Sequence, residues 1–267
     1  YDLSNGTSQD PSCANISFIV PSPTPSTSRP TINIPQCTVL LNDRNYVYGL
    51  TSTGGNSILL DTFGYESSDI AHTSNKMWLV NYTANTIVEY NITLNPWSSS
   101  LSRTISIPTD IDLGPGLASK TNTVLLGVDT SGIYNQIVEL NITTNTAVST
   151  PLINLPSGRT ITGDIILTTT NKILITNNSD TNYYLTQYNY TTGSLEVEVD
   201  ITNYTTSAFG LYVQNSALYM IDSYGVIYNI NLNYPYVITR YNDVAPLVAG
   251  ASQIPTCISV NLIPIGP

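Results

Sequence analysis

The sequence predicts an all-β protein built from a repeated unit of four short strands, and three observations lead to this fold class. Only 10% of the 267 residues are charged, and the polarity comes instead from Asn, Thr, Ser and Tyr, which suit strands and turns. Two β-rich runs separated by a polar turn recur along the chain, which indicates a repeated hairpin. No stretch has the 3.6-residue period of an amphipathic helix, and this excludes a helical solenoid.

One asparagine in each hairpin aligns the repeats. Asn91, Asn141, Asn189 and Asn231 are equivalent, spaced 50, 48 and 42 residues apart. A short segment with small residues precedes each hairpin and another strand follows it. Four such strands form the blade of a β-propeller, in which the first strand is innermost. The expected innermost strands are 68–73, 116–121, 163–168 and 210–215, the hairpins 76–93, 122–143, 172–191 and 217–233, and the outer strands 102–108, 148–156, 195–202 and 236–243.

A fifth blade is expected from the two ends of the chain. Residues 248–257 supply its innermost strand, because Gly250 aligns with Gly116 and Gly210 of the complete units. The sequence therefore predicts a five-bladed β-propeller of four-stranded antiparallel blades, with the closing blade shared between the N- and C-terminal segments. The other three strands of this blade are expected at 38–42, 45–50 and 57–63, joined by the turns DR and TSTGGN.

This closure predicts a disulfide between Cys37 and Cys257. Cys257 ends the innermost strand of the shared blade, and Cys37 precedes the strand that pairs with it. A bridge that encloses about 220 residues contributes roughly 4–5 kcal/mol on the loop-entropy account. The alternative is two buried free thiols.

The first residues repeat the closing strand. Six of the eight residues in 6–13 match residues 250–257 or differ only by Ser for Thr. We therefore expect residues 1–20 to close a similar, neighbouring propeller, with Cys13 as a candidate for a disulfide to that unit. The propellers are then either tandem in one polypeptide or separate subunits joined head-to-tail. The alternative is that residues 1–20 pack on their own propeller. The expected divisions are 1–20, a Pro/Ser/Thr-rich extended linker 21–36, the propeller 37–257, and the start of the next connector 258–267.

Charge and hydropathy limit the partners. The net charge of −10 argues against nucleic acid and against electrostatic binding to anionic lipid. No apolar run approaches the length of a membrane span. The chain begins at Tyr1, so we expect a processed protein or a section of a longer one. The partners are expected to be copies of itself or similar propellers.

Covalent glycans and secretion are also expected. Asn-x-Ser/Thr sequons fall just before equivalent turns of the repeat, where a glycan could lie on the surface, although composition alone yields several sequons. The linker is either an O-glycosylated stalk or an ordinary solvated connector. The N-glycosylation candidates are Asn5, Asn15, Asn81, Asn91, Asn141, Asn177, Asn189 and Asn203, and the O-glycosylation candidates are Ser22, Thr24, Ser26, Thr27 and Ser28.

The sequence contains no signature of a nucleophile triad, a metal cluster, a P-loop or a dinucleotide fold, so no cofactor, metal or catalytic residue is expected. For the single histidine, His72, a structural or solvent-facing role is favoured over a catalytic one. Asp69 and Asp164 occupy equivalent innermost positions, and several glycosidase families resemble this chain in using five-bladed propellers with carboxylates near the axis. The alternative is that each caps a turn or bonds to backbone N–H groups. Trp78 and Trp97 occur in one unit only, which argues against a sugar site in every blade.

Over residues 37–257 the strand–turn repeats and the shared closing blade resemble the broad class of β-propeller repeat proteins. Low-charge propellers rich in Asn, Thr and Tyr are similar to microbial surface proteins and virion proteins. The resemblance is specific for fold and weak for function, and our first hypothesis is a structural subunit or repeat of an extracellular glycoprotein filament or surface array rather than an enzyme. A lectin-like or viral attachment module is the alternative, and a propeller glycosidase is the third possibility. We expect tyrosines such as Tyr90, Tyr188, Tyr212 and Tyr228 to pack between blades.

Overall fold

The computed structural model describes residues 32–35, 38–50, 56–132, 135–205, 208–215, 217–231, 237–243, 248–253 and 255–258. Within these ranges the regular secondary structure is all strand, apart from one short 3₁₀ helix. No helix in this part of the chain is long and apolar enough to cross a membrane.

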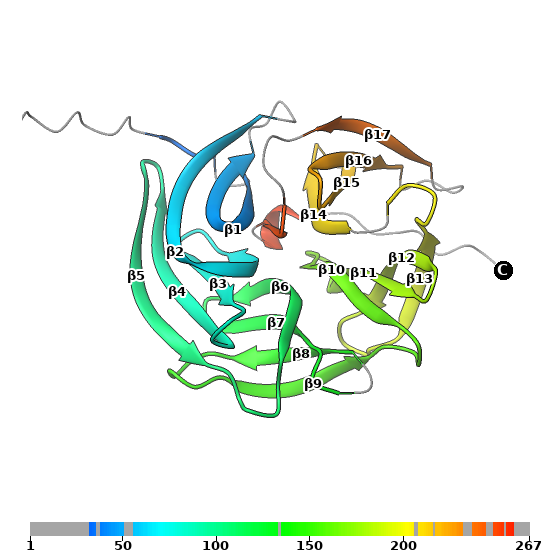
Figure 1. The fold of residues 1–267 in the computed structure, drawn as a ribbon, viewed down its shortest axis with the longest axis horizontal. Helices are drawn as coiled ribbons and strands as arrows, with labels where there is room; N and C mark the ends of the chain where they lie inside the picture. The colour runs from blue at the N-terminus through cyan, green and yellow to red at the C-terminus, as the bar shows by residue number, and fades with distance from the viewer. Residues whose placement is uncertain are drawn as a thin grey trace, which may run out of the picture. The chain divides into compact units, whose positions relative to one another are not determined.

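The elements follow one another along the chain, and Figure 1 labels β1 to β17. They are β1 (Val39–Leu50), β2 (Ser57–His72), β3 (Lys76–Asn81), β4 (Thr86–Leu94), β5 (Trp97–Ser106), β6 (Leu113–Thr121), β7 (Val124–Asp129), β8 (Gln136–Asn141), β9 (Val148–Asn154), β10 (Thr160–Leu167), β11 (Lys172–Ser179), β12 (Asn182–Asn189), β13 (Leu195–Asp200), β14 (Ala208–Gln214), β15 (Ala217–Asp222), β16 (Val226–Ile230), β17 (Ile238–Asp243), β18 (Gly250–Ser252) and η1 (Pro255–Cys257).

Three four-stranded antiparallel sheets follow the chain order, β6–β9, β10–β13 and β14–β17. The second half of β2 forms an equivalent group of four with β3, β4 and β5. The repeat asparagines Asn91, Asn141 and Asn189 stand opposite the first residues of β3, β7 and β11, respectively. The predicted all-β class and the four-stranded antiparallel blades are therefore confirmed (Figure 1).

Strand β2 belongs to this group and also pairs with β1, which in turn pairs with β18 near the C-terminal end of the described residues. Its first half pairs with β1 and its second half pairs with β3. Strand β18 pairs antiparallel with β1, with Leu40 opposite Ser252 and Asn42 opposite Gly250. The resulting sheet has six strands in the order β18-β1-β2-β3-β4-β5.

The predicted strand boundaries near these ends are wrong in three places. The expected strands 38–42 and 45–50 form one strand, β1, because Arg44 (φ 46°) belongs to a bulge and not to a hairpin turn. The expected strands 57–63 and 68–73 are also continuous in β2. Among the described residues of 248–257, only Gly250–Ser252 is strand, since Pro255, which has no N–H to donate, begins η1.

The apolar cores lie between neighbouring blades. One core joins Ala71 and Trp78 of β2 and β3 to Leu117 and Leu125 of β6 and β7, and similar cores follow round the ring. Aromatic packing confirms the tyrosine prediction, because Tyr90, Tyr188 and Tyr212 are buried and Tyr228 packs against a core while partly exposed. Trp78 is fully buried, so its ring cannot stack on a sugar.

Candidate functional site

The first strands of the four blades, β2, β6, β10 and β14, lie round the centre of Figure 1, and β18 contacts all four. Residues 249–258 are here called the closing segment. The space between Leu117, Ile165, Ala251 and Gln253 is only about 10 Å³. A cavity needs about 10–15 Å³ to hold one water, so this part of the axis is packed and offers no room for a substrate.

Gly250 marks the tightest approach. A Cβ atom at this position would lie 1.9 Å from Oδ1 of Asp69 and 2.7 Å from Oδ1 of Asn42. Gly210 is similar, because its Cβ would lie 2.8 Å from Cβ of Ala251. Glycine is therefore required where the closing segment meets the neighbouring strands, which gives the predicted alignment of these glycines its physical reason.

Asp69 and Asp164 connect the innermost strands. Oδ1 of Asp69 accepts the N–H of Ile70 (2.6 Å), and Oδ2 accepts that of Leu117 in β6 (2.8 Å). Asp164 repeats this arrangement with Ile165 and with Leu211 in β14, at 2.7 Å each. The two residues are equivalent, as the repeat predicts, and each carboxylate links two blades.

Both carboxyl groups are buried, with Asp69 1% exposed and Asp164 0% exposed. Burial raises the pKa of each above its ordinary value, and the charge of Asp69 adds to the rise for Asp164. A raised carboxyl pKa is common in catalytic acids, but those acids contact substrate. Here all four carboxyl oxygens bond to backbone N–H groups, which favours the structural alternative for Asp69 and Asp164.

His72 holds the closing segment from another side. Its Nδ1 lies 2.8 Å from Oγ of Ser252, and its backbone carbonyl accepts a hydrogen bond from Oγ of Ser119 (2.6 Å). His72 is 1% exposed, and burial lowers its pKa from 6.5 to about 3. The imidazole is therefore neutral in the folded protein and links three innermost strands, in agreement with the predicted structural role.

We predict that His72 makes the fold sensitive to acid. The unfolded chain binds a proton near pH 6.5 and the folded chain only near pH 3, so stability falls as the pH drops between these values. The free energy of unfolding should decrease by about 2 kcal/mol between pH 7 and pH 5 from this residue alone. Denaturant unfolding at both pH values should show this loss in the wild type but not in His72→Gln. Equal losses in the two proteins would contradict the assignment.

Gln253 and Cys257 complete the attachment of the closing segment. The Gln253 amide forms two hydrogen bonds with the backbone of Val213 in β14, accepting at 2.9 Å and donating at 2.8 Å. Cys257 is disulfide-bonded. Its predicted partner Cys37 lies outside the described residues, as does Cys13, so the predicted pairing stays a prediction. Ile258 then accepts the N–H of Thr169 at 2.8 Å, after β10.

The predicted N-glycan positions differ in exposure. Asn91, Asn141 and Asn203 are exposed, and Asn81 and Asn189 are half-buried. Asn5 and Asn15 lie outside the described residues, as do the O-glycan candidates Ser22, Thr24, Ser26, Thr27 and Ser28.

Asn177 does not suit a glycan in the folded protein. It is 1% exposed, its Nδ2 donates to Oγ1 of Thr186 (2.8 Å), and its Oδ1 accepts from Arg159 (3.3 Å). A sugar on this amide would displace at least the first of these contacts. We therefore leave Asn177 out of the proposed glycan positions.

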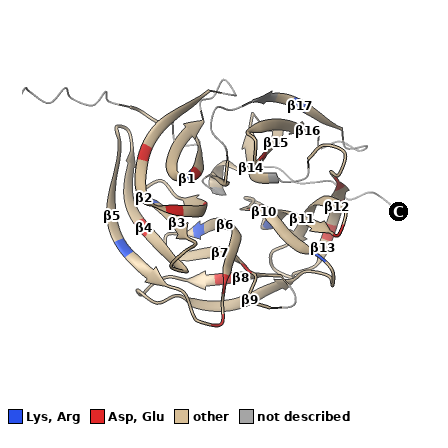
Figure 2. Ribbon diagram, in the orientation of Figure 1, with Lys and Arg blue, Asp and Glu red and all other residues tan. Residues whose placement is uncertain are grey.

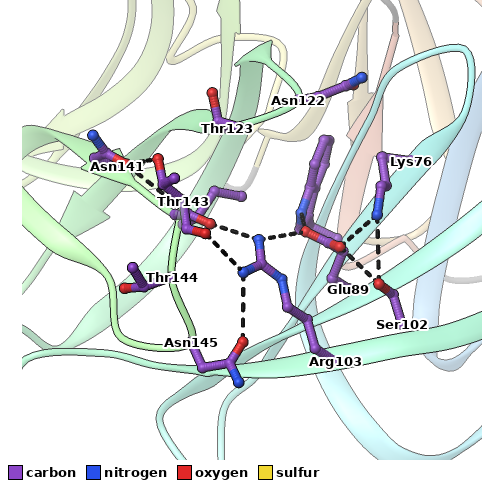
Figure 3. Close-up of polar contacts among 12 residues, drawn as sticks. Lys76, Glu89, Ser102, Arg103, Asn122, Thr123, Asn141, Thr143, Thr144 and Asn145 are labelled. Carbon is purple, nitrogen blue, oxygen red and sulfur yellow. Dashed lines mark hydrogen bonds and ion pairs between the residues drawn. The ribbon is translucent and has the colours of Figure 1, made fainter.

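A polar cluster around Glu89 was not predicted from the sequence (Figure 3). Glu89, which is 2% exposed, pairs with Lys76 (2.6 Å) and Arg103 (3.0 Å) and accepts hydrogen bonds from Trp78 (3.1 Å) and Ser102 (2.9 Å). These donors lower its pKa from 4.5 to about 2 despite the cost of burial.

Arg103 extends the Glu89 cluster to the next blade. Its Nη2 also donates to the carbonyl of Ile142 (2.6 Å), in the turn after β8. The sequence holds one signal for such clusters, since a polar residue stands two places before each repeat asparagine. These residues are Glu89, Glu139, Gln187 and Asn229, and Glu139 pairs with Lys120 at 3.0 Å.

Charged residues are few and dispersed over the ring in Figure 2, and the described part has no cluster of His, Cys, Asp or Glu that could hold a metal ion. A surface pocket of about 320 Å³ does occur where β2, β6 and β14 begin to converge. Its lining includes Ser68, Tyr82, Pro115 and Phe209. It is a second candidate for a binding site, and it does not include Asp69 or Asp164.

No family model matches the chain, and no curated protein matches it. Solved structures do match the chain. A chain of a nidogen/laminin complex is 10% identical, with 82% of this chain and 99% of that chain covered and a TM-score of 0.53. TolB from Acinetobacter baumannii is 9% identical, with a TM-score of 0.51, and the match covers 81% of this chain and 65% of TolB. Both are β-propellers, and at this identity the likeness shows the fold alone: the chain is a β-propeller.

Proposed function

We propose that the chain is a structural subunit or repeat of an extracellular glycoprotein filament or surface array, joined head-to-tail through its terminal strands and Pro-rich linkers. One observation carries this proposal. Three closing-segment residues that contact the rest of the ring, Gly250, Ser252 and Gln253, recur near the N-terminus as Gly6, Ser8 and Gln9. A chain with two closing segments and one ring can close its own propeller and a neighbour's.

We further propose that the propeller has five blades. Strands β18, β1 and the first half of β2 form one continuous part of the six-stranded sheet, beyond the four complete blades. We assign these three strands to a fifth blade that joins the two ends of the ring. The contacts of β18 with β2 and β14 on either side support this closure.

The proposed ring is fastened by a Cys37–Cys257 disulfide. Cys257 is bridged, and Thr38, the residue after Cys37, leads into the strand that pairs with β18. Consecutive Cα atoms lie only 3.8 Å apart, so the chain keeps Cys37 near the start of β1. This leaves Cys13 for a bridge to another propeller.

A disulfide-bonded propeller of low charge suits an oxidising, extracellular environment. The exposed Asn91 and Asn141 lie at equivalent positions, at or near the turns after the third strands of adjacent blades. We propose these two as the leading N-glycan positions, with Asn81, Asn189 and Asn203 as further ones.

Electron microscopy and intact-mass analysis of the native material test this function. We expect strings of propeller-sized particles, and a peptide mass increased by glycans at Asn91 and Asn141. Isolated particles with unmodified asparagines would contradict the proposal.

A recognition module of the lectin-like or viral attachment kind is the alternative, and the 320 Å³ pocket is the observation that favours it. Tyr82 is 67% exposed at this pocket, and an exposed aromatic ring can stack on a sugar. This alternative predicts glycan-array binding that Tyr82→Ala abolishes. Tyr224→Ala is the matched control, because Tyr224 is 75% exposed and does not line the pocket. Equal binding by both variants would reject this pocket as the binding site.

A further inference from the structure

We infer that residues 6–13 are a second closing segment, built to fill the axial seat of another propeller whose own closing segment does not occupy it. The axial seat is defined here as Asp69, His72, Val213 and the β1 residues Leu40–Asn42. This inference rests on the proposed function and names the surface through which one unit joins the next. The partner is a propeller with the same seat whose own closing segment is absent or displaced.

The first requirement of the seat is glycine. Any side chain at position 250 would collide with Asp69, whose carboxylate is fixed by the N–H groups of Ile70 and Leu117. The N-terminal segment has Gly6 at the matching position. Few of the chain's residues are glycine, 16 of 267, so this match is informative.

The second requirement is a pair of polar side chains in sequence. Ser252 bonds to the ring nitrogen of His72, and Gln253 forms two hydrogen bonds with the backbone of Val213. Ser8 and Gln9 repeat this pair at the same distance from the glycine. Because the glutamine amide bonds to backbone atoms and not to a side chain, any propeller with an equivalent innermost strand can form these two hydrogen bonds.

The third match is the cysteine. Cys257 follows Gly250 by seven residues and is disulfide-bonded, and Cys13 follows Gly6 by seven residues. A segment seated through Gly6, Ser8 and Gln9 would therefore bring Cys13 to the place that Cys257 occupies.

One of the two unmatched positions indicates which segment binds the axial seat more tightly. Ala251, 1% exposed, lies against Gly210, and the N-terminal segment has the larger Thr7 at this position. We therefore expect the chain's own closing segment to bind its axial seat more tightly than residues 6–13 do. Residues 14–31 then form a tether of up to about 55 Å at ~3.1 Å per residue, enough to reach an adjacent ring.

A cross-linking experiment with full-length chains tests this inference. The acceptor carries Cys13→Ser, Gln253→Ala and Cys257→Ser, so that Cys37 is its one thiol and its own closing segment is weakened. The donor is the wild type. In a glutathione buffer the Cys13 and Cys37 thiols lose two protons and two electrons to oxidised glutathione, and one donor–acceptor disulfide forms. We expect this heterodimer to be the main product.

Matched donors show whether seating causes the cross-link. Gln9→Ala should reduce the heterodimer about tenfold, because two hydrogen bonds are lost. Ser4→Ala, outside the matched residues, should leave it unchanged. Near-ultraviolet circular dichroism of the acceptor, compared with that of the wild type, checks that it is folded. If it is not, a peptide of residues 4–20 should restore that signal, and Gln9→Ala peptide should not.

Three results separate this inference from the proposed function. No heterodimer, or equal yields from all donors, would overturn the inference even if the native material is filamentous. A heterodimer that depends on Gln9, together with native material made of isolated particles, would uphold the seat and reject the filament. A bridge from Cys13 to Cys37 within one chain, seen when the Cys257→Ser variant is analysed alone, would support the seat and count against head-to-tail joining.

Discussion

The Gly250→Ala variant is expected to lose at least about 3 kcal/mol of its free energy of unfolding, the largest effect we predict for a single methyl group. The new Cβ would lie 1.9 Å from Oδ1 of Asp69. If Asp69 moves away, the buried N–H of Leu117 loses its partner, and if β18 moves, its pairing with β1 is lost. In a chain of this size the midpoint of thermal unfolding should fall by about 6–12 °C.

Gly64→Ala is the matched control. A Cβ at Gly64 would meet no atom within 4 Å, so this variant should stay within about 0.5 kcal/mol of the wild type. Thermal unfolding of the two variants side by side checks the prediction. Similar stabilities would mean that the closing segment is not held tightly against Asp69.

The Glu89→Gln variant is expected to lose about 3 kcal/mol of stability at pH 7. The change leaves Lys76 and Arg103, each about a fifth exposed, without their anionic partner. The pKa of Glu89 is lowered to about 2, so its contribution is present above pH 4.5 and is lost as the pH falls through 2. The wild type should therefore lose stability on acidification below pH 4.5 more steeply than the variant, as measured by urea unfolding.

Glu66→Gln is the matched control for Glu89→Gln, because it removes a surface ion pair instead of a buried one. Glu66 is 62% exposed and lies 3.8 Å from Arg44, so its removal should change stability by less than about 0.5 kcal/mol. Parallel acid profiles for the wild type and Glu89→Gln would show that the Glu89 cluster adds no net stability.

The blades could be predicted from the sequence because each strand pairs with the next strand along the chain. Each hairpin pairs residues at most 17 positions apart, so one asparagine per unit was enough to align the strands. The equivalence of Asp69 and Asp164 followed from the same period. Their roles did not, because the N–H groups of Leu117 and Leu211 come from other blades and only the folded ring brings them to the carboxylates.

The remaining errors have a tertiary cause. Asp43 is a common turn residue, but β1 pairs with β18 before it and with β2 after it, so the strand continues through this point with a bulge at Arg44. The Glu89 cluster needs Arg103 to reach the turn at Ile142 of the next blade, and no local pattern encodes that contact. The contacts of Ser252 and Gln253 are equally non-local. Our proposal of a second closing segment uses these contacts as the reason for the repetition of those residues at Ser8 and Gln9.

The most direct test of the account is a disulfide map of the native protein, obtained by mass spectrometry of a non-reducing digest. We predict that Cys37 is bridged to Cys257 within one chain, and that Cys13 is bridged to a cysteine of a different propeller. A Cys13–Cys37 bridge within one chain, or a free Cys13 in material that is fully oxidised elsewhere, would contradict the claim that the chain closes two rings.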